Sequence, residues 1–140
     1  MSGKNVSPWH DRVLHYQITL QMIKDKPELG SGIGSYRSAF PAYRTKEAQF
    51  GGTLAHNDFL QILCETGVFG CLLFAVFWGY VALWGARRIL REPDVGERWF
   101  LAGLYVSVLA FLIHSVVDFN FFNPSLVTFE FLLAGLFFSW

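Results

Sequence analysis

The sequence predicts an all-α integral membrane protein, with two full spans and a truncated third, preceded by a loop unit that contains an amphipathic helix. Hydrophobic residues make up 53% of the 140-residue chain and charged residues only 16%, and the mean hydropathy is +0.35. Residues 66–86 and 99–117 contain no Asp, Glu, Lys or Arg, and a bilayer core requires about 20 predominantly apolar residues per helix. The formal net charge is zero, which argues against nucleic-acid binding.

The first predicted element is a helix over 7–26. Ser7 suits the capping position, Pro8 suits the first helical position, and Pro27 lies just beyond the end. Apolar residues recur at spacings of three and four in two stripes, formed by Val13, Tyr16, Leu20 and Ile23 and by Leu14, Ile18 and Met22. A separate polar stripe contains Arg12, His15 and Thr19. We expect this helix to lie on a membrane or to pack against other helices.

Residues 27–55 are predicted to form a glycine-rich loop. Gly30, Gly32 and Gly34 permit tight turns and the close approach of a ligand. Together with the preceding helix, this loop forms the first predicted domain, residues 1–57.

The second predicted domain, residues 58–140, carries the membrane helices. A helix is expected to run from Asn57 to Leu90, and the spans themselves at about 66–86, 99–117 and 126–140. The last span has about 15 residues and a length of about 22 Å, which is less than the roughly 30 Å of a bilayer core. We therefore expect the chain to be a fragment or a truncated product.

The connection between the first two spans is short and basic. It carries Arg87, Arg88, Arg91 and Arg98. The positive-inside rule places such a connection in the cytoplasm, so we expect residues 1–57 on the opposite side of the membrane.

Three polar residues, His56, Asn57 and Asp58, stand at the start of the first membrane helix. A histidine at a membrane interface can act as a general base near neutral pH. Alternatively, the three residues cap the helix in water, a role for which Asn and Asp are favoured. The pattern leaves both interpretations open.

Arg12, Arg37 and Arg44 are candidates for phosphate binding, because arginine pairs bidentately with phosphate and stays charged near a membrane. Solvated surface or contact with lipid headgroups is the alternative. Arg12 is of most interest, since it shares a helix face with His15.

His114 and Asp118 are spaced i, i+4 near the outer end of the second span, where ionisable residues are candidates for function. This spacing could supply two metal ligands. Because further ligands are not evident, we expect no metal and favour a hydrogen bond between the two side chains. Glu65 and Glu130 also lie in apolar surroundings, so each needs a polar partner or a cavity.

Gly67 and Gly70 lie near Cys71 and Ala75 in the first span. These small residues predict a face that allows close packing of helices.

The order and spacing of these motifs resemble those of the O-antigen ligase and polymerase family of bacterial inner-membrane glycosyltransferases. His56 and Asn57, nine further residues, then Gly67 and Gly70 match the family's histidine motif. The upstream "PELGSGIGSYRSAF" resembles the glycine-rich segment that precedes this histidine. The downstream "HSVVDFNFFNPS" resembles the segment at the next outer loop. The resemblance covers most of the chain.

The resemblance implies transfer of a glycan from an undecaprenyl-pyrophosphate carrier to a lipid A core or a growing polysaccharide, with inversion and with neither metal nor cofactor. It implies a multi-pass protein of the inner membrane with residues 1–57 in the periplasm. His56 would then activate or orient the acceptor and Arg12 would contact the pyrophosphate. Arg37, Asn57 and Asp58 become substrate-binding candidates, whereas the candidates for structural roles are Gly32, Gly34, Gly67, Gly70, His114 and Asp118.

Family members are much longer, so the chain corresponds to the carboxy-terminal part and would need the amino-terminal helices, for instance as a separate chain. Two other functions compete with glycan transfer. One is a non-catalytic membrane module for assembly or binding that retains only the fold. The other is a metal-dependent membrane hydrolase that uses His56, His114 and Asp118.

Overall fold

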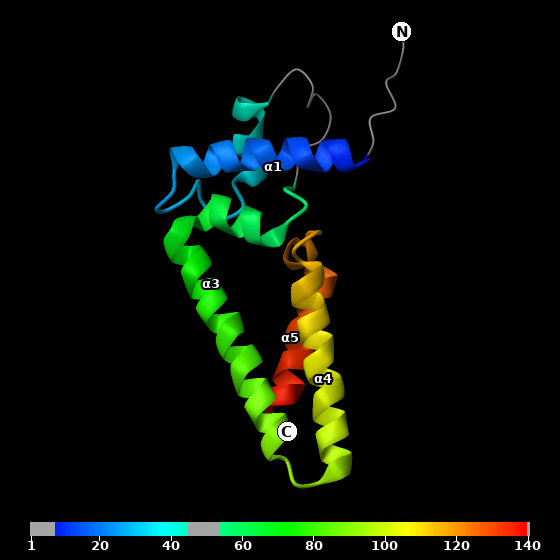
Figure 1. Ribbon diagram of the computed structural model, residues 1–140. Coiled ribbons are helices and arrows are strands. Elements are labelled where there is room, and N and C mark those ends of the chain that lie inside the picture. Colours follow the sequence, from blue (N-terminus) through cyan, green and yellow to red (C-terminus); the bar gives the residue numbers. More distant parts are fainter. Residues whose placement is uncertain (1–7, 45–53, 140) are drawn as a thin grey trace. The chain divides into compact units, whose positions relative to one another are not determined.

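The computed structural model describes residues 8–44 and 54–139, and within these ranges it contains helices and no strand. The chain divides into two compact units, Met1–Cys71 and Leu72–Trp140. Figure 1 shows the succession of helices along the chain. The all-helical prediction is confirmed.

Helix α1 spans Pro8–Asp25. It begins at a proline, which has the backbone angle of a first helical residue, and it ends shortly before Pro27. Ser7, the expected cap, lies outside the described residues. The buried face of α1 combines two apolar side chains with two members of the polar stripe, namely Ile18, Met22, His15 and Thr19. In contrast, Val13 and Leu20 of the expected apolar stripe are exposed.

The polar side chain of Thr19 can be buried because it is fully hydrogen-bonded. Its hydroxyl donates to the His15 carbonyl at 2.7 Å and therefore accepts from the Tyr36 hydroxyl at 2.8 Å. Burial raises the pKa of Tyr36 to about 12, so this side chain remains a donor at neutral pH. The bond ties α1 to the segment that follows it.

The segment predicted as a loop contains two short helical turns, α2 (Tyr36–Ala39) and η1 (Phe40–Tyr43). The expected glycine-rich loop over 27–55 is therefore helical at Tyr36–Tyr43. Tyr36 and Phe40, one turn apart, enter a core that also contains Ile18, Met22, Ala55 and Cys64. Burial of two aromatic rings favours a helical turn here even though the surrounding sequence is rich in glycine and serine.

Helix α3 spans Asp58–Arg91, but it is not the continuous helix that the sequence predicted. Gly67 has φ 65° and ψ −171°, which interrupts the helix. This combination of angles is accessible almost only to glycine. The segment before the break packs within the first unit, where Cys64 contributes to the core.

The second unit contains α3 from Leu72 onward, then α4 (Val95–His114), η2 (Asn120–Phe122) and α5 (Pro124–Ser139). Helices α3 and α4 are long and apolar enough to cross a membrane, whereas α5 is a shorter apolar helix. Asp94 caps α4 by accepting the Glu97 backbone N–H at 2.9 Å. The two full membrane spans predicted from the sequence thus correspond to helices α3 and α4.

Aromatic packing holds the second unit together. Its core contains Trp78, Val81, Val108 and Ala134. Phe121 of η2 places its ring edge-to-face against Phe74 at 5.0 Å and against Trp78 at 5.5 Å, a geometry that adds to apolar burial. Many large apolar side chains on these helices are exposed, as expected for lipid-facing surfaces.

Candidate active site

His56 lies at the turn that leads into α3 and has a strained backbone. Its φ is 54°, the one positive value at a non-glycine residue within the described ranges. Such residues are uncommon and gather at functional sites. The Tyr16 hydroxyl donates a hydrogen bond to the His56 carbonyl at 2.9 Å. A side chain of α1 therefore holds the backbone of the candidate histidine.

The imidazole of His56 stacks on the imidazole of His15. The ring centroids are 5.8 Å apart and the ring planes differ by 3°. On another side, His15 meets Phe40 edge-to-face at 5.3 Å. His15 is only 6% exposed, and its Nδ1 is buried without a hydrogen bond to any residue of 8–44 or 54–139. The sequence placed His15 on a polar stripe but gave no sign of this contact.

Burial lowers the pKa of His15, and the proximity of His56 lowers it further, whereas Asp11 opposes the shift. Desolvation disfavours the charged imidazolium, and a second imidazole that can be protonated has the same effect. The His15 ring is therefore uncharged at neutral pH.

Asn57 and Asp58 are placed to start α3. The Asn57 side-chain oxygen accepts the Leu60 backbone N–H at 2.9 Å, the geometry of a helix cap. Asp58 is 1% exposed in the first turn, where the helix dipole favours a negative charge. Asn57 thus acts as a cap of α3, whereas His56 lies before the helix begins.

Two of the three candidate arginines pack against aromatic rings of the first unit. Arg12 lies one turn before His15 on α1, half-buried, with its guanidinium 5.6 Å from the Trp9 ring. Arg44 lies 6.0 Å from the Phe40 ring, and that ring also contacts His15. Arg37 is exposed on α2.

Glu65 anchors the glycine-rich segment, a role that sequence reasoning missed. It is 3% exposed. One oxygen accepts the Gly34 backbone N–H at 2.7 Å, and the other accepts the Tyr36 N–H at 3.2 Å and the Gln61 amide at 3.3 Å. Gly34 reaches this position with φ 74°. The carboxylate therefore fixes the segment that leads to Tyr36 and the core of the first unit.

The carbonyls at the helix break also bind this segment. The backbone N–H of Ser31 donates to the Cys64 carbonyl at 2.9 Å, and that of Gly32 donates to the Glu65 carbonyl at 2.8 Å. These carbonyls would otherwise lack partners where the helix stops. Gly32, with φ 108°, supplies the required backbone turn.

The two glycines of the histidine motif have separate steric roles. An added Cβ at Gly67 would lie 2.1 Å from the Glu28 carbonyl oxygen, and one at Gly70 would lie 2.3 Å from the Thr66 Cβ. Similarly, a Cβ at Gly30 would lie 2.6 Å from the Gly67 nitrogen. The closest atoms to the motif glycines thus belong to the loop backbone and to Thr66, and packing of these glycines against a second helix stays a prediction.

His114 and Asp118 do not form the expected hydrogen bond. Helix α4 ends at His114, so the two residues are not one turn apart on a helix. His114 Nδ1 instead lies 2.9 Å from the side-chain amide nitrogen of Asn120. The Asp118 carboxylate accepts the Phe119 backbone N–H at 3.0 Å. In the part of the chain that the structure describes, no group of three or more His, Cys, Asp or Glu side chains is placed to hold a metal ion.

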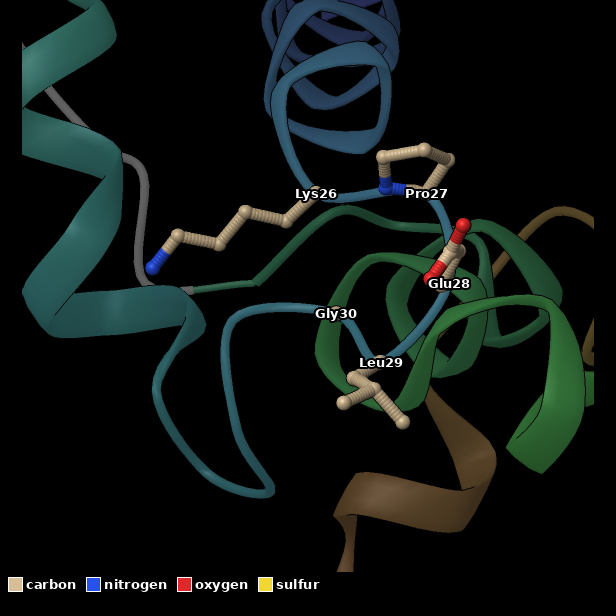
Figure 2. A pocket seen from close by; sticks show the side chains of 5 residues that line it. All are labelled: Lys26, Pro27, Glu28, Leu29 and Gly30. Atoms are coloured by element: carbon tan, nitrogen blue, oxygen red, sulfur yellow. The ribbon is translucent and has the colours of Figure 1, made fainter.

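A shallow pocket of about 330 Å³ lies on the segment after α1 and is lined by Lys26, Pro27, Glu28, Leu29 and Gly30. Figure 2 shows the Lys26 side chain extending away from Glu28 and Leu29. The pocket contains none of the residues of the histidine pair. We therefore assign the candidate site to the surroundings of His56 and not to this pocket.

Residues 4–75 match the O-Antigen ligase family. The match covers just over half of the chain and includes α1, the glycine-rich segment, His56 and both glycines of the histidine motif. No curated protein and no solved structure matches the chain. Together, the family and the two long apolar helices indicate a membrane protein. The resemblance seen in the sequence is thus confirmed, and the chain belongs to the O-antigen ligase family.

Proposed function

We propose that the chain transfers a glycan from an undecaprenyl-pyrophosphate carrier to a lipid A core or a growing polysaccharide, at the periplasmic face of the inner membrane. Membership of the O-antigen ligase family supports glycan transfer. The observation that carries the assignment of His56 is its strained backbone and its ring contact with His15, in a unit that also contains Arg12.

In this proposal, the acceptor hydroxyl attacks the anomeric carbon of the glycan. A C–O bond forms to the acceptor oxygen while the bond from the anomeric carbon to the pyrophosphate oxygen breaks. His56 accepts the hydroxyl proton through an imidazole nitrogen. The electron pair of the broken bond remains on the undecaprenyl pyrophosphate. A single displacement of this kind inverts the anomeric centre.

Negative charge on the leaving pyrophosphate needs a cation, and arginine provides one that remains charged near a membrane. Arg12 is the first candidate, because it lies on the same helix as His15 and Tyr16, which both contact His56. Arg44 is a better second candidate than Arg37, because its guanidinium packs on Phe40 beside the histidine pair.

The test is His56→Ala in the full reading frame that contains this chain. Membranes would be supplied with a radiolabelled undecaprenyl-pyrophosphate glycan and with lipid A core from the same host. We expect the rate of transfer to fall by about 10²- to 10⁴-fold, the usual contribution of general acid–base catalysis. His10→Ala is the matched control, because His10 is an exposed histidine of α1. A transfer rate for His56→Ala equal to that of this control would exclude the assigned role. Binding of the carrier with no turnover by the unmodified protein would support a non-catalytic module.

A further inference from the structure

We propose that His15 is a positioning residue for His56 and that the His15 ring sets the plane in which the His56 imidazole meets the acceptor. This inference rests on the function proposed for His56. It names a residue that lies on a different element, α1, and is separated from His56 by the whole glycine-rich segment.

The first support is the geometry of the rings. The planes of His15 and His56 are parallel to within 3° at a centroid distance of 5.8 Å, which is within the range of offset stacking. Phe40 contacts His15 at 88°, edge against face. His15 therefore has an aromatic neighbour that restricts its own rotation, and it presents a flat face to His56.

The second support is the rigidity of the His15 position. Its carbonyl accepts the Thr19 hydroxyl at 2.7 Å, and Thr19 is 0% exposed. Ile18 and Met22, which follow on the same helix, belong to the core of the first unit. The helix that carries His15 is thus fixed by buried residues in the turns that follow His15.

The third support is that neighbouring residues of α1 hold two different parts of His56. His15 contacts its ring, and Tyr16 donates a hydrogen bond to its carbonyl at 2.9 Å. Holding both the backbone and the ring leaves the side chain few orientations. Because catalysis depends steeply on the position of the reacting groups, such a constraint has a direct effect on rate.

The charge of His15 is also suited to this role. Burial and the neighbouring His56 both favour its uncharged form, against the opposing influence of Asp11. An uncharged ring does not repel the imidazolium that forms on His56 when the acceptor proton is transferred.

The experiment compares His15→Phe with His15→Leu in the full reading frame, using the labelled carrier glycan and lipid A core described above. Phe retains a flat ring against His56, whereas Leu fills the site with an apolar side chain that has no ring. We expect His15→Phe to keep kcat within about threefold of the unmodified protein and His15→Leu to lower kcat by about 10- to 100-fold, the range set by misplacement of a reacting group. The KM for either substrate should change by less than about twofold, because the proposal places His15 behind His56 and not against the substrates.

Folding is checked by gel filtration in detergent and by thermal unfolding of both variants. Equal kcat values for the Phe and Leu variants would overturn the proposal, and so would a loss that appears in KM alone. If His56→Ala abolishes transfer while His15→Leu retains the full kcat, only the positioning role is lost. If His56→Ala leaves transfer intact, the proposed function fails, and the role of His15 fails with it.

Discussion

At the scale of single residues, Glu65 illustrates how a buried carboxylate can be held by backbone N–H groups and a side-chain amide. Its two oxygens accept the backbone N–H groups of Gly34 and Tyr36 and the amide of Gln61. Hydrogen bonds to an ionised group are roughly twice as strong as those between neutral groups. The carboxylate therefore replaces its lost hydration with donors from a segment that lies about 30 residues earlier in the chain, at separations of 31 and 29 residues.

Glu65→Gln should destabilise the protein although it hardly changes the volume of the side chain. Both oxygens of Glu65 accept backbone N–H groups, and the amide nitrogen of Gln cannot accept. At least one buried donor would lose its partner, which costs about 1–3 kcal/mol. Thermal or denaturant-induced unfolding of the detergent-solubilised protein measures the change.

Glu28→Gln serves as the control for this substitution. Glu28 is an exposed residue of the same segment, and surface substitutions usually change stability by less than about 0.5 kcal/mol. If the two variants unfold alike, the carboxylate of Glu65 does not anchor the segment.

The sequence suggested His56 as a site residue but gave no reason to pair it with His15, and the explanation is physical. His56 belongs to a local motif, in which its distance from Gly67 and Gly70 can be read directly. In contrast, the contact of His15 with His56 depends on how the segment that carries His56 folds back on α1. The exposed Val13 and Leu20 show the same limit, since more than one face of α1 is apolar enough to be buried. The environment of a polar residue on such a helix follows only from tertiary structure.

At the scale of elements, the break in α3 creates the platform on which the glycine-rich segment rests. Carbonyls at the end of the first helical part accept N–H groups from Ser31 and Gly32. On the far side of the break, the Val68 N–H donates to the Pro27 carbonyl at 2.8 Å. A continuous helix would use these groups internally. The break therefore makes backbone groups available for binding the loop.

Gly67→Ala should be strongly destabilising. The alanine would have to adopt φ 65° and ψ −171°, a region essentially restricted to glycine. Its Cβ would also lie 2.1 Å from the Glu28 carbonyl oxygen, and a backbone atom cannot yield as a side chain can. We expect a loss of about 3 kcal/mol or more, measured as unfolding in detergent together with faster proteolysis of residues 27–35.

Gly79→Ala is the control for Gly67→Ala, because it makes the same substitution in the same helix, α3, away from the break. No atom lies within 4 Å of a Cβ at Gly79, and alanine is favoured over glycine in a helix interior by up to about 1 kcal/mol. This variant should be as stable as the parent or slightly more so. Comparable losses at Gly67 and Gly79 would show that α3 has no special conformation at the break.

The helices themselves were largely predictable, because long charge-free segments and the positions of proline determine where they lie. The interruption of α3 was not, because a glycine in an apolar run is compatible with an intact helix as well as with a break. Likewise, α2 and η1 are short and depend on the burial of Tyr36 and Phe40. Local sequence pattern therefore predicts long elements better than the turns that build the site.

At the scale of the whole molecule, the lengths of the apolar helices can be compared with a bilayer. Helix α4 has 20 residues and a length of about 30 Å, which equals the thickness of a typical hydrocarbon core. Helix α5, as the structure describes it, has 16 residues and a length of about 24 Å, which is less than that thickness. One charged side chain of α5, Glu130, is 2% exposed, which removes it from lipid.

Reporter fusions at Pro93 and Pro124 should therefore report opposite sides of the membrane. Pro93 lies between α3 and α4, beside the basic residues that favour the cytoplasm, and Pro124 begins α5, beyond the span proposed for α4. Green fluorescent protein should be fluorescent at Pro93, and alkaline phosphatase should be active at Pro124, with the reverse fusions inactive as controls. Changing Arg87, Arg88 and Arg91 together to Gln should weaken this preference, because the arrangement depends on their charge. If both original fusions report the same compartment, α4 does not cross the bilayer, and the periplasmic location proposed for His56 loses its support.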